Sequence, residues 1–269
     1  MSLWEAFVLG LVQGLTEFLP ISSSAHLVLV PRLLGWPPPS LAFAAALHGA
    51  TAVALVAYFW RDWARLVRER PRFLALLAAG SLPAIVLGVA FSGPIEAHLR
   101  GVPVMAGALI AGAIALGMAE VMGSKRERPE ELEQVGWRRV AFVGAAQALA
   151  LLPGVSRLGI TIAAGMSSGL QREAAARFSL LLGTPLLLAV GAGKLVELAR
   201  EGAGREAVMT PGALALAVSF ITAATVGVLA IRSLLLFLER HSLLWFVAYR
   251  LALGGSLLGL LLSGRLSGA

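Results

Sequence analysis

The 269-residue sequence contains no cysteine and unusually little charge. The absence of cysteine excludes disulfides, thiol catalysis and cysteine-ligated zinc. Charged residues make up only 14% of the chain, whereas about 25% is typical of a soluble domain that must face water. Hydrophobic residues make up 58% and the mean hydropathy is +0.83, so the bilayer is expected to take the place of water around much of the surface.

Basic platforms with aromatic residues for stacking are also absent. The net charge of +7 therefore does not predict a nucleic-acid partner, because the arginines lie in the gaps between apolar runs, where the positive-inside rule places them. The apolar residues 1–19 have neither a basic start nor a small-residue cleavage site, so we expect them to be mature protein rather than a signal peptide.

Six apolar runs are long enough to cross a bilayer, which takes about twenty helical residues. They cover residues 41–60, 73–91, 104–122, 177–198, 212–234 and 244–262. Two further apolar stretches, 4–30 and 140–169, are each interrupted by a polar segment that contains proline. Non-helical backbone at membrane depth is tolerated only inside protein or beside a wet cavity, so both stretches are predicted to be re-entrant helix hairpins.

The two interrupted stretches resemble each other in sequence. The aligned pairs are Gln13 with Gln147, Pro20 with Pro153, and Ser23 with Ser156. Each stretch precedes three spanning runs, and an odd number of spans between the halves predicts that the second half is inverted. Inverted repeats with interrupted helices place their binding site at the repeat interface, near the bilayer midplane.

The predicted architecture is therefore an all-α integral membrane protein, with six transmembrane helices and two re-entrant hairpins in an inverted-topology repeat. The first repeat covers residues 1–123, a cytoplasmic linker covers 124–139, and the second repeat covers 140–269. Lysine and arginine gather near residues 61–72, 125–139 and 232–240, which should mark the cytoplasmic side. Both termini are then expected outside.

The first interrupted stretch carries a dense set of polar groups. Gln13 and Glu17 are four residues apart and share one helix face. Pro20 ends that helix, and the serines at 22–24 can cap the next one, whose free N–H groups and dipole favour an anion. His26, one turn later, could face a serine hydroxyl. Ionisable groups inside a membrane segment indicate function, although a set of caps around one buried carboxylate is the simpler alternative.

The second interrupted stretch predicts another anion pocket. Ser156 is expected to cap a helix, with Arg157 beside it and Thr161 about one turn later. The guanidinium of arginine presents a planar fork of donors that suits phosphate oxygens. An ion pair between Arg157 and Glu17 is the structural alternative, and it too would bring the two halves together. The combined set of groups suits phosphoryl transfer.

Residues 13–26 (Gln-Gly-Leu-Thr-Glu-Phe-Leu-Pro-Ile-Ser-Ser-Ser-Ala-His) and 153–161 (Pro-Gly-Val-Ser-Arg-Leu-Gly-Ile-Thr) resemble the two signatures of the undecaprenyl-diphosphate phosphatases, the bacitracin-resistance family. Residues 178–185 and 249–250 also look like family segments, so the resemblance covers nearly the whole chain. It implies a multi-pass enzyme of the bacterial inner membrane that hydrolyses undecaprenyl diphosphate on the external, periplasmic face. That reaction recycles the lipid carrier for peptidoglycan synthesis.

The resemblance also implies roles for individual residues. Ser23 would be the nucleophile and His26 its acid/base partner, while Glu17 would orient or activate groups, together with a divalent cation such as Mg²⁺ or Ca²⁺. No organic cofactor is implied. Arg157 is also expected to be catalytic and would hold the diphosphate together with Ser156 and Thr161. The residues expected to bind the substrate are Gln13, Ser22, Ser24, Ser156 and Thr161.

Two positions depart from the family pattern. Gln13 stands where the family often has glutamate, and an amide cannot act as a base. Leu158 replaces the last serine of a common Ser-Arg-Ser motif, so either one phosphate contact is missing or that position does not face the pocket.

Other polar residues in apolar runs carry weaker expectations. His48 is expected to be a hydrogen-bonded core histidine. Glu120, Lys194, Glu197 and Arg250 lie near the ends of runs, where snorkelling to the interface is the simpler explanation. Arg250 is the best of them as a residue that supports the site.

A secondary transporter or lipid flippase is the main alternative function, because inverted repeats with interrupted helices are a transporter architecture. The pairing of Ser23 with His26 separates the two, since transport does not need it. A phosphatase with a histidine nucleophile is rejected, because no His followed by Asp at the needed spacing comes after Arg157. Besides the polyprenyl diphosphate substrate and the bilayer, a homodimer is left open as a partner.

Overall fold

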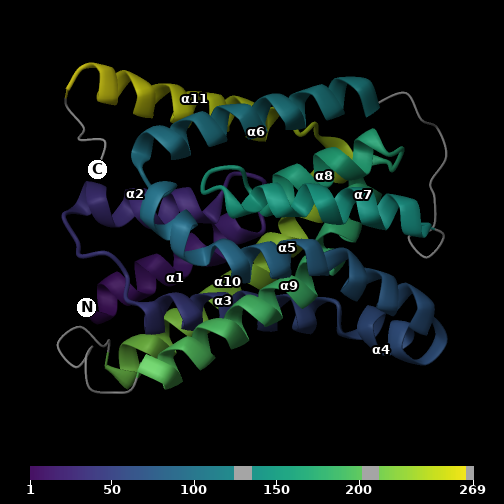
Figure 1. Ribbon diagram of the computed structural model, residues 1–269, viewed down its shortest axis with the longest axis horizontal. Coiled ribbons are helices and arrows are strands. Elements are labelled where there is room, and N and C mark those ends of the chain that lie inside the picture. Colours follow the sequence, from purple (N-terminus) through teal and green to yellow (C-terminus); the bar gives the residue numbers. More distant parts are fainter. Residues whose placement is uncertain (124–134, 202–211, 265–269) are drawn as a thin grey trace.

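The computed structural model describes residues 1–123, 135–201 and 212–264, and within these ranges the regular structure is entirely helical (Figure 1). The elements are α1 (Leu3–Glu17), α2 (Ser23–Leu34), α3 (Leu41–Tyr58), α4 (Trp60–Glu69), α5 (Pro71–His98), α6 (Val102–Gly123), α7 (Trp137–Ala148), the 3-10 turn η2 (Leu149–Leu151), α8 (Arg157–Ser167), α9 (Arg172–Glu201), α10 (Ala213–Arg240) and α11 (Leu244–Leu262). Most of the predicted linker at 124–139 lies outside the described residues.

Five helices are long and apolar enough to cross a membrane, which makes this a multi-pass membrane protein. They are Pro71–Phe91, Val102–Gly123, Arg172–Gly193, Ala213–Arg240 and Leu244–Leu262. The first expected run, 41–60, is represented by α3, where Ala46–Tyr58 counts among the shorter apolar helices.

The arginine-rich segment after α3 is a helix rather than the short loop expected from the sequence. Arg61, Arg65 and Arg68 lie on α4, whose charged residues leave only Leu66 buried. Asp62 of α4 accepts a 2.5 Å hydrogen bond from Arg177 of α9. This contact holds the basic helix against the membrane bundle.

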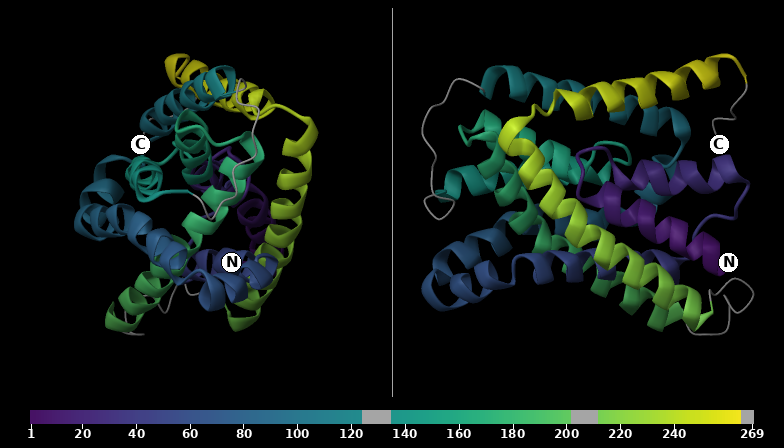
Figure 2. Two further views of the ribbon diagram at one scale, coloured as in Figure 1. Left: turned by 90° about the vertical axis from the view of Figure 1, so that its right-hand side faces the viewer. Right: turned by 180° about the vertical axis from the view of Figure 1, so that it is seen from behind.

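The two interrupted stretches each form a pair of helices around a polar turn. In Figures 1 and 2, α1 and α2 occupy one end of the bundle while α7 and α8 occupy the other, and the turns of both pairs lie toward the middle. Helix α1 packs along α10, and α7 packs along α5, so each pair is held by a long helix from the other half of the chain. Helices α3 and α9, and helices α6 and α11, pack against each other in the same reciprocal way.

Small residues set the close approach between α5 and α7. A Cβ added to Gly144 would overlap the backbone of Gly80, so these two helices touch through their main chains. Lipid tails are as apolar as the helix surfaces, so the hydrophobic effect does not drive helices together in a membrane. Close packing of backbones at small residues is a main source of their association instead. The position of α7 relative to α5 therefore depends on this glycine pair.

Candidate active site

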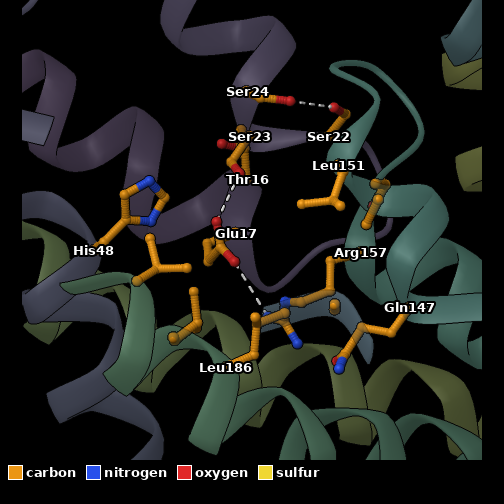
Figure 3. A pocket seen from close by; sticks show the side chains of 15 residues that line it. Thr16, Glu17, Ser22, Ser23, Ser24, His48, Gln147, Leu151, Arg157 and Leu186 are labelled. Atoms are coloured by element: carbon orange, nitrogen blue, oxygen red, sulfur yellow. Dashed lines mark hydrogen bonds and ion pairs between the residues drawn. The ribbon is translucent and has the colours of Figure 1, made fainter. Parts of the chain in front are cut away.

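A cavity of about 170 Å³ lies between the two helix pairs and is walled by α3, α5 and α9 (Figure 3). Its apolar walls are alanine, leucine and valine side chains. The polar residues that line it are Thr16, Glu17, Ser22, Ser23, Ser24, His48, Gln147, Ser156 and Arg157. Residues from both signature motifs thus meet in one place, as the sequence predicted.

Both polar turns have the same unusual backbone at the residue before the second helix. Ser22 has φ +76° and Ser156 has φ +68°, and these are the only non-glycine residues with positive φ in the described part of the chain. Such geometry costs about 1–3 kcal/mol, and it is often found at active sites. Since Ser22 and Ser156 occupy the same N-cap position, the structure pairs Ser22 with Ser156 and Ser23 with Arg157, one residue away from the alignment drawn from the sequence.

Glu17 is the centre of the hydrogen-bond network in the cavity. Its Oε2 accepts a 2.6 Å hydrogen bond from Ser23 Oγ and a 3.2 Å bond from Gln13 Nε2. Its Oε1 forms a 3.1 Å ion pair with Arg157, so the predicted pairing across the halves is confirmed (Figure 3). A hydroxyl-to-carboxylate distance of about 2.6 Å is that of a strong, charge-assisted bond. The carboxylate is therefore in place to accept the proton of Ser23.

The position of Arg157 at the start of α8 is determined by a neighbouring helix. Its guanidinium lies directly over Gly183 of α9, where an added Cβ would overlap it, and Nη1 is 3.5 Å from the carbonyl of Ser179. A cation at a helix N-terminus and an anion at a helix C-terminus both oppose the helix dipole. Arg157 and Glu17, at the ends of α8 and α1, offset this by pairing with each other.

His26 is held by partners other than the Ser23 hydroxyl that the sequence suggested. Its Nδ1 is 2.7 Å from the carbonyl oxygen of Ser22, and its Nε2 is 2.7 Å from the hydroxyl of Tyr249 on α11. Tyr249 also stacks on the imidazole, with ring centroids 5.8 Å apart. Both nitrogens are engaged, and Glu17 rather than His26 contacts the Ser23 hydroxyl.

The residues expected to bind the substrate divide into two groups. Ser22, Ser24 and Ser156 line the cavity. Thr161 does not: it is fully buried, and its hydroxyl donates to backbone carbonyls of its own helix at 2.8 and 3.2 Å. Gln13 is also fully buried and reaches the cavity only through Glu17.

Two cap positions behave differently from each other. The Ser156 hydroxyl accepts a 3.2 Å bond from Gly159 N and caps α8, as expected. The Ser22 side chain makes no capping bond and lies 3.2 Å from Ser24 Oγ. Leu158 is buried and does not line the cavity, which fits the view that the family serine at this position does not face the pocket.

Arg250 does not snorkel: it has no exposed surface and is the largest fully buried side chain in the described part of the chain. Its guanidinium donates to five backbone carbonyls, two of them on α6 at Ala108 and Leu109. The other three lie on the polar turns: Pro20 at 3.3 Å, Gly154 at 3.1 Å and Val155 at 2.8 Å. Arg250 thus joins the turns of both helix pairs.

The remaining polar residues were also placed differently from expectation. Glu120 is buried and pairs with Arg172, and it accepts a 2.7 Å bond from Ser242, so it does not snorkel. His48 lines the cavity instead of lying in the core. The side chains of Lys194 and Glu197 lie outside the described residues. Gln147 lines the cavity although the sequence suggested no role for it; its alignment with Gln13 was the available signal.

Glu17 is the one carboxylate that lines the cavity within the described part of the chain, where no group of three His, Asp or Glu residues gathers. Mg²⁺ commonly binds one or two protein carboxylates and completes its shell with water and substrate phosphates. Glu17 and the serine hydroxyls suit that mode, in which the substrate itself supplies most of the ligands.

Comparison with known proteins finds a single family over nearly the whole chain. The family described as bacitracin resistance protein BacA matches residues 6–256. A protein of Geobacter sulfurreducens is 43% identical over 276 residues, which cover 97% of this chain and 99% of the relative, and is named undecaprenyl-diphosphatase. Relatives of the same name from Chlorobium phaeovibrioides and Chlorobium phaeobacteroides are 42% and 39% identical, each over 99% of both chains. The chain belongs to the bacitracin resistance protein BacA family.

Proposed function

We propose that this protein is an undecaprenyl-diphosphatase, a membrane hydrolase that converts undecaprenyl diphosphate to undecaprenyl phosphate and phosphate. The names of the relatives support the activity. The observation in the chain itself that carries the proposal is the 2.6 Å bond from Ser23 Oγ to Glu17, with Arg157 on the other carboxylate oxygen and all three residues lining one cavity. The comparisons do not favour the transporter or flippase alternative.

In the proposed reaction, Ser23 Oγ attacks the terminal phosphorus of the diphosphate. The O–P bond to Ser23 forms, the bond to the bridging oxygen breaks, and undecaprenyl phosphate leaves while Glu17 takes the serine proton. The oxygen of a water molecule then bonds to the phosphorus of the phosphoserine as the bond from phosphorus to Ser23 Oγ breaks. Glu17 returns its proton to Ser23 Oγ, and phosphate leaves with the hydrogens of the water, its excess proton passing to solvent. Nucleophile and base already lie within hydrogen-bond distance, the geometry that such a mechanism requires.

Charge on the transferring phosphoryl group is stabilised by fixed donors. Helices α2 and α8 both begin at the cavity, at Ser23 and Arg157, and helix N-termini favour anions through free N–H groups and the dipole. The Arg157 guanidinium supplies the formal positive charge. His26, which Ser22 and Tyr249 hold in place, orients the start of α2 and does not act as the base for Ser23.

A divalent cation would be held by Glu17 and the phosphate oxygens of the substrate. When bound, it would neutralise negative charge on the diphosphate. Ser23, Glu17 and Arg157 are the side chains to which this proposal gives the nucleophile, the base and the positive charge.

We also propose that the chain is an inverted-topology repeat with two re-entrant helix hairpins, with the two halves at 1–123 and 140–269 around the linker. Three observations support this: the matching positive φ of Ser22 and Ser156, the reciprocal packing of α1 on α10 and α7 on α5, and the opposite ends from which the two helix pairs enter the bundle. Six membrane crossings then include α3 beside the five longer spans.

The proposed location is the bacterial inner membrane, with the site open to the external side. Basic α4 and the end of α10 at Arg240 lie at one end of the bundle, and the N-terminus lies at the other (Figure 2). The chain has no cysteine, so a single cysteine at Arg100 can be labelled cleanly in intact cells. External labelling supports this orientation, and labelling only after the membrane is broken contradicts it.

Phosphate release from a long-chain polyprenyl diphosphate, by the purified protein in detergent with Mg²⁺ supplied, tests the activity. Wild type should release phosphate, and Ser23→Ala should lose at least about 100-fold in rate while still inserting and folding. Absence of release by the wild type would refute the phosphatase. Near-normal release by Ser23→Ala would leave the activity but remove Ser23 as the nucleophile.

A further inference from the structure

Gln147 lies on α7, lines the cavity and has no exposed surface. Within the described residues, neither its amide nitrogen Nε2 nor its carbonyl oxygen Oε1 has a hydrogen-bond partner. About nine in ten or more buried polar groups in proteins have such a partner, because an unmatched one costs free energy. A cavity-lining amide with both ends unmatched therefore points to a ligand that completes it.

Arg157 has an unused donor in the same cavity. Its Nη2 is bonded to Glu17 and its Nη1 to the Ser179 carbonyl, but Nε has no acceptor among the described residues. Figure 3 shows Arg157 and Gln147 both reaching into the cavity from the second half of the chain. The nearby walls are Ala84, Leu186 and Leu187, which offer no side-chain acceptor.

The corresponding glutamine of the first half shows what Gln147 lacks. Gln13 has Glu17 four residues later and donates to it at 3.2 Å. Four residues after Gln147 the chain has Leu151, which also lines the cavity. The second helix pair thus has the amide without the carboxylate, and the described residues offer no acceptor for its N–H groups, which leaves them free to bind a ligand.

The charge in the cavity indicates what that acceptor is. Glu17 and Arg157 neutralise each other in part, so a diphosphate entering the cavity needs donors that Glu17 does not already occupy. Arg157 Nε and Gln147 Nε2 are two such donors, and a phosphate group presents several acceptor oxygens. An uncharged amide can bind these oxygens without forming a competing ion pair with Glu17.

We propose that Gln147 is a substrate-binding residue whose amide donates a hydrogen bond to the phosphate that Arg157 Nε also binds. This assignment rests on the proposed phosphatase function and extends it. It adds a substrate-binding side chain from the second helix pair that lies outside the signature motif at 153–161. Gln147 binds the transferring phosphate from its position on α7, and Arg157 binds the same phosphate from the start of α8.

The first test compares the kinetics of Gln147→Met and Gln147→Glu with wild type. Methionine keeps the length of the side chain and removes both polar ends, so KM for the polyprenyl diphosphate should rise about tenfold to a hundredfold, the range for a lost hydrogen bond to a charged group. Glutamate keeps the size but repels the anion, so its kcat/KM should fall further than that of methionine. Ser219→Ala, a buried serine of α10 that does not line the cavity, serves as the control and should keep wild-type kinetics.

Thermal unfolding in the same detergent separates binding from a structural role. Removing two unmatched polar atoms should leave the Tm of Gln147→Met equal to or above that of wild type. Inorganic pyrophosphate should raise the Tm of Ser23→Ala, which cannot turn substrate over, and should raise that of the Ser23→Ala, Gln147→Met double variant much less.

Three results would overturn the assignment: an unchanged KM for Gln147→Met, a smaller loss for glutamate than for methionine, or an equal pyrophosphate shift in the two Ser23→Ala proteins. The outcomes also separate the two proposals. A wild type that releases no phosphate refutes the function. If the wild type is active and substitutions of Gln147 leave its kinetics unchanged, only the binding role of Gln147 is refuted.

Discussion

Replacing Arg250 with methionine should disconnect the two polar turns that build the site. Three of its five carbonyl acceptors, on Pro20, Gly154 and Val155, belong to those turns, where the backbone is not held by a regular helix. A buried carbonyl that loses its partner costs about 1–3 kcal/mol, so three of them amount to about 3–9 kcal/mol before the chain relaxes. A single substitution rarely costs more than about 4–5 kcal/mol, so Arg250→Met should rank among the most destabilising changes in the chain.

The assay combines thermal unfolding in detergent with phosphate release at a temperature where the variant remains folded. Arg250→Met should lower the Tm strongly and reduce kcat, because Ser23 and Arg157 begin the helices that follow the two turns. Arg250→Lys keeps the charge and three donors in a smaller group, so it should recover part of both losses. A Tm within about 1 °C of wild type, together with normal turnover, would refute the idea that Arg250 holds the turns together.

Three further substitutions test the network around Glu17. Glu17→Gln should lower kcat by about 100-fold or more, since it removes the base for Ser23 and the partner of Arg157; phosphate release measures this, and a loss below about tenfold contradicts the role. Gly183→Ala should displace the Arg157 guanidinium and cut kcat/KM by about tenfold or more with the fold retained, whereas unchanged kinetics would show that Arg157 is not held there. Tyr249→Phe removes only the 2.7 Å bond to His26 and should cost less than about tenfold in kcat; a loss as large as that of Ser23→Ala would require a direct catalytic role for His26.

Much of the fold could be predicted from the apolar runs. Five of the six expected spans recur as membrane-length helices, because about twenty apolar residues need a helix to satisfy their backbone in lipid. The segment after α3 was predicted wrongly as a loop. Its arginines form α4, since charged residues with long side chains are good helix formers and Arg177 of α9 anchors Asp62 there.

The sequence predicted which residues form the site better than it predicted which groups they contact. Glu17, Ser23 and Arg157 were named from the motifs, and the pairing of Glu17 with Arg157 was expected, whereas the bond from Ser23 to Glu17 was not. The role of His26 beside Ser23 and the cavity position of Thr161 were not supported, because each side chain takes partners from its own helix or from Tyr249. Sequence spacing gives the face of a helix but not which neighbouring group is nearest.

The sequence by itself determined that this is a helical membrane protein, that two interrupted stretches carry the polar residues, and to which family the motifs point. These properties depend on hydropathy and on short motifs, which are local along the chain. Only the tertiary structure decided the partners of Arg250, the geometry in which Arg157 meets Glu17, and the lack of a partner for the Gln147 amide among the described residues. Arg250 lies 230 residues from Pro20 and Arg157 lies 140 residues from Glu17, so their contacts arise from how whole helices pack, which no local pattern encodes.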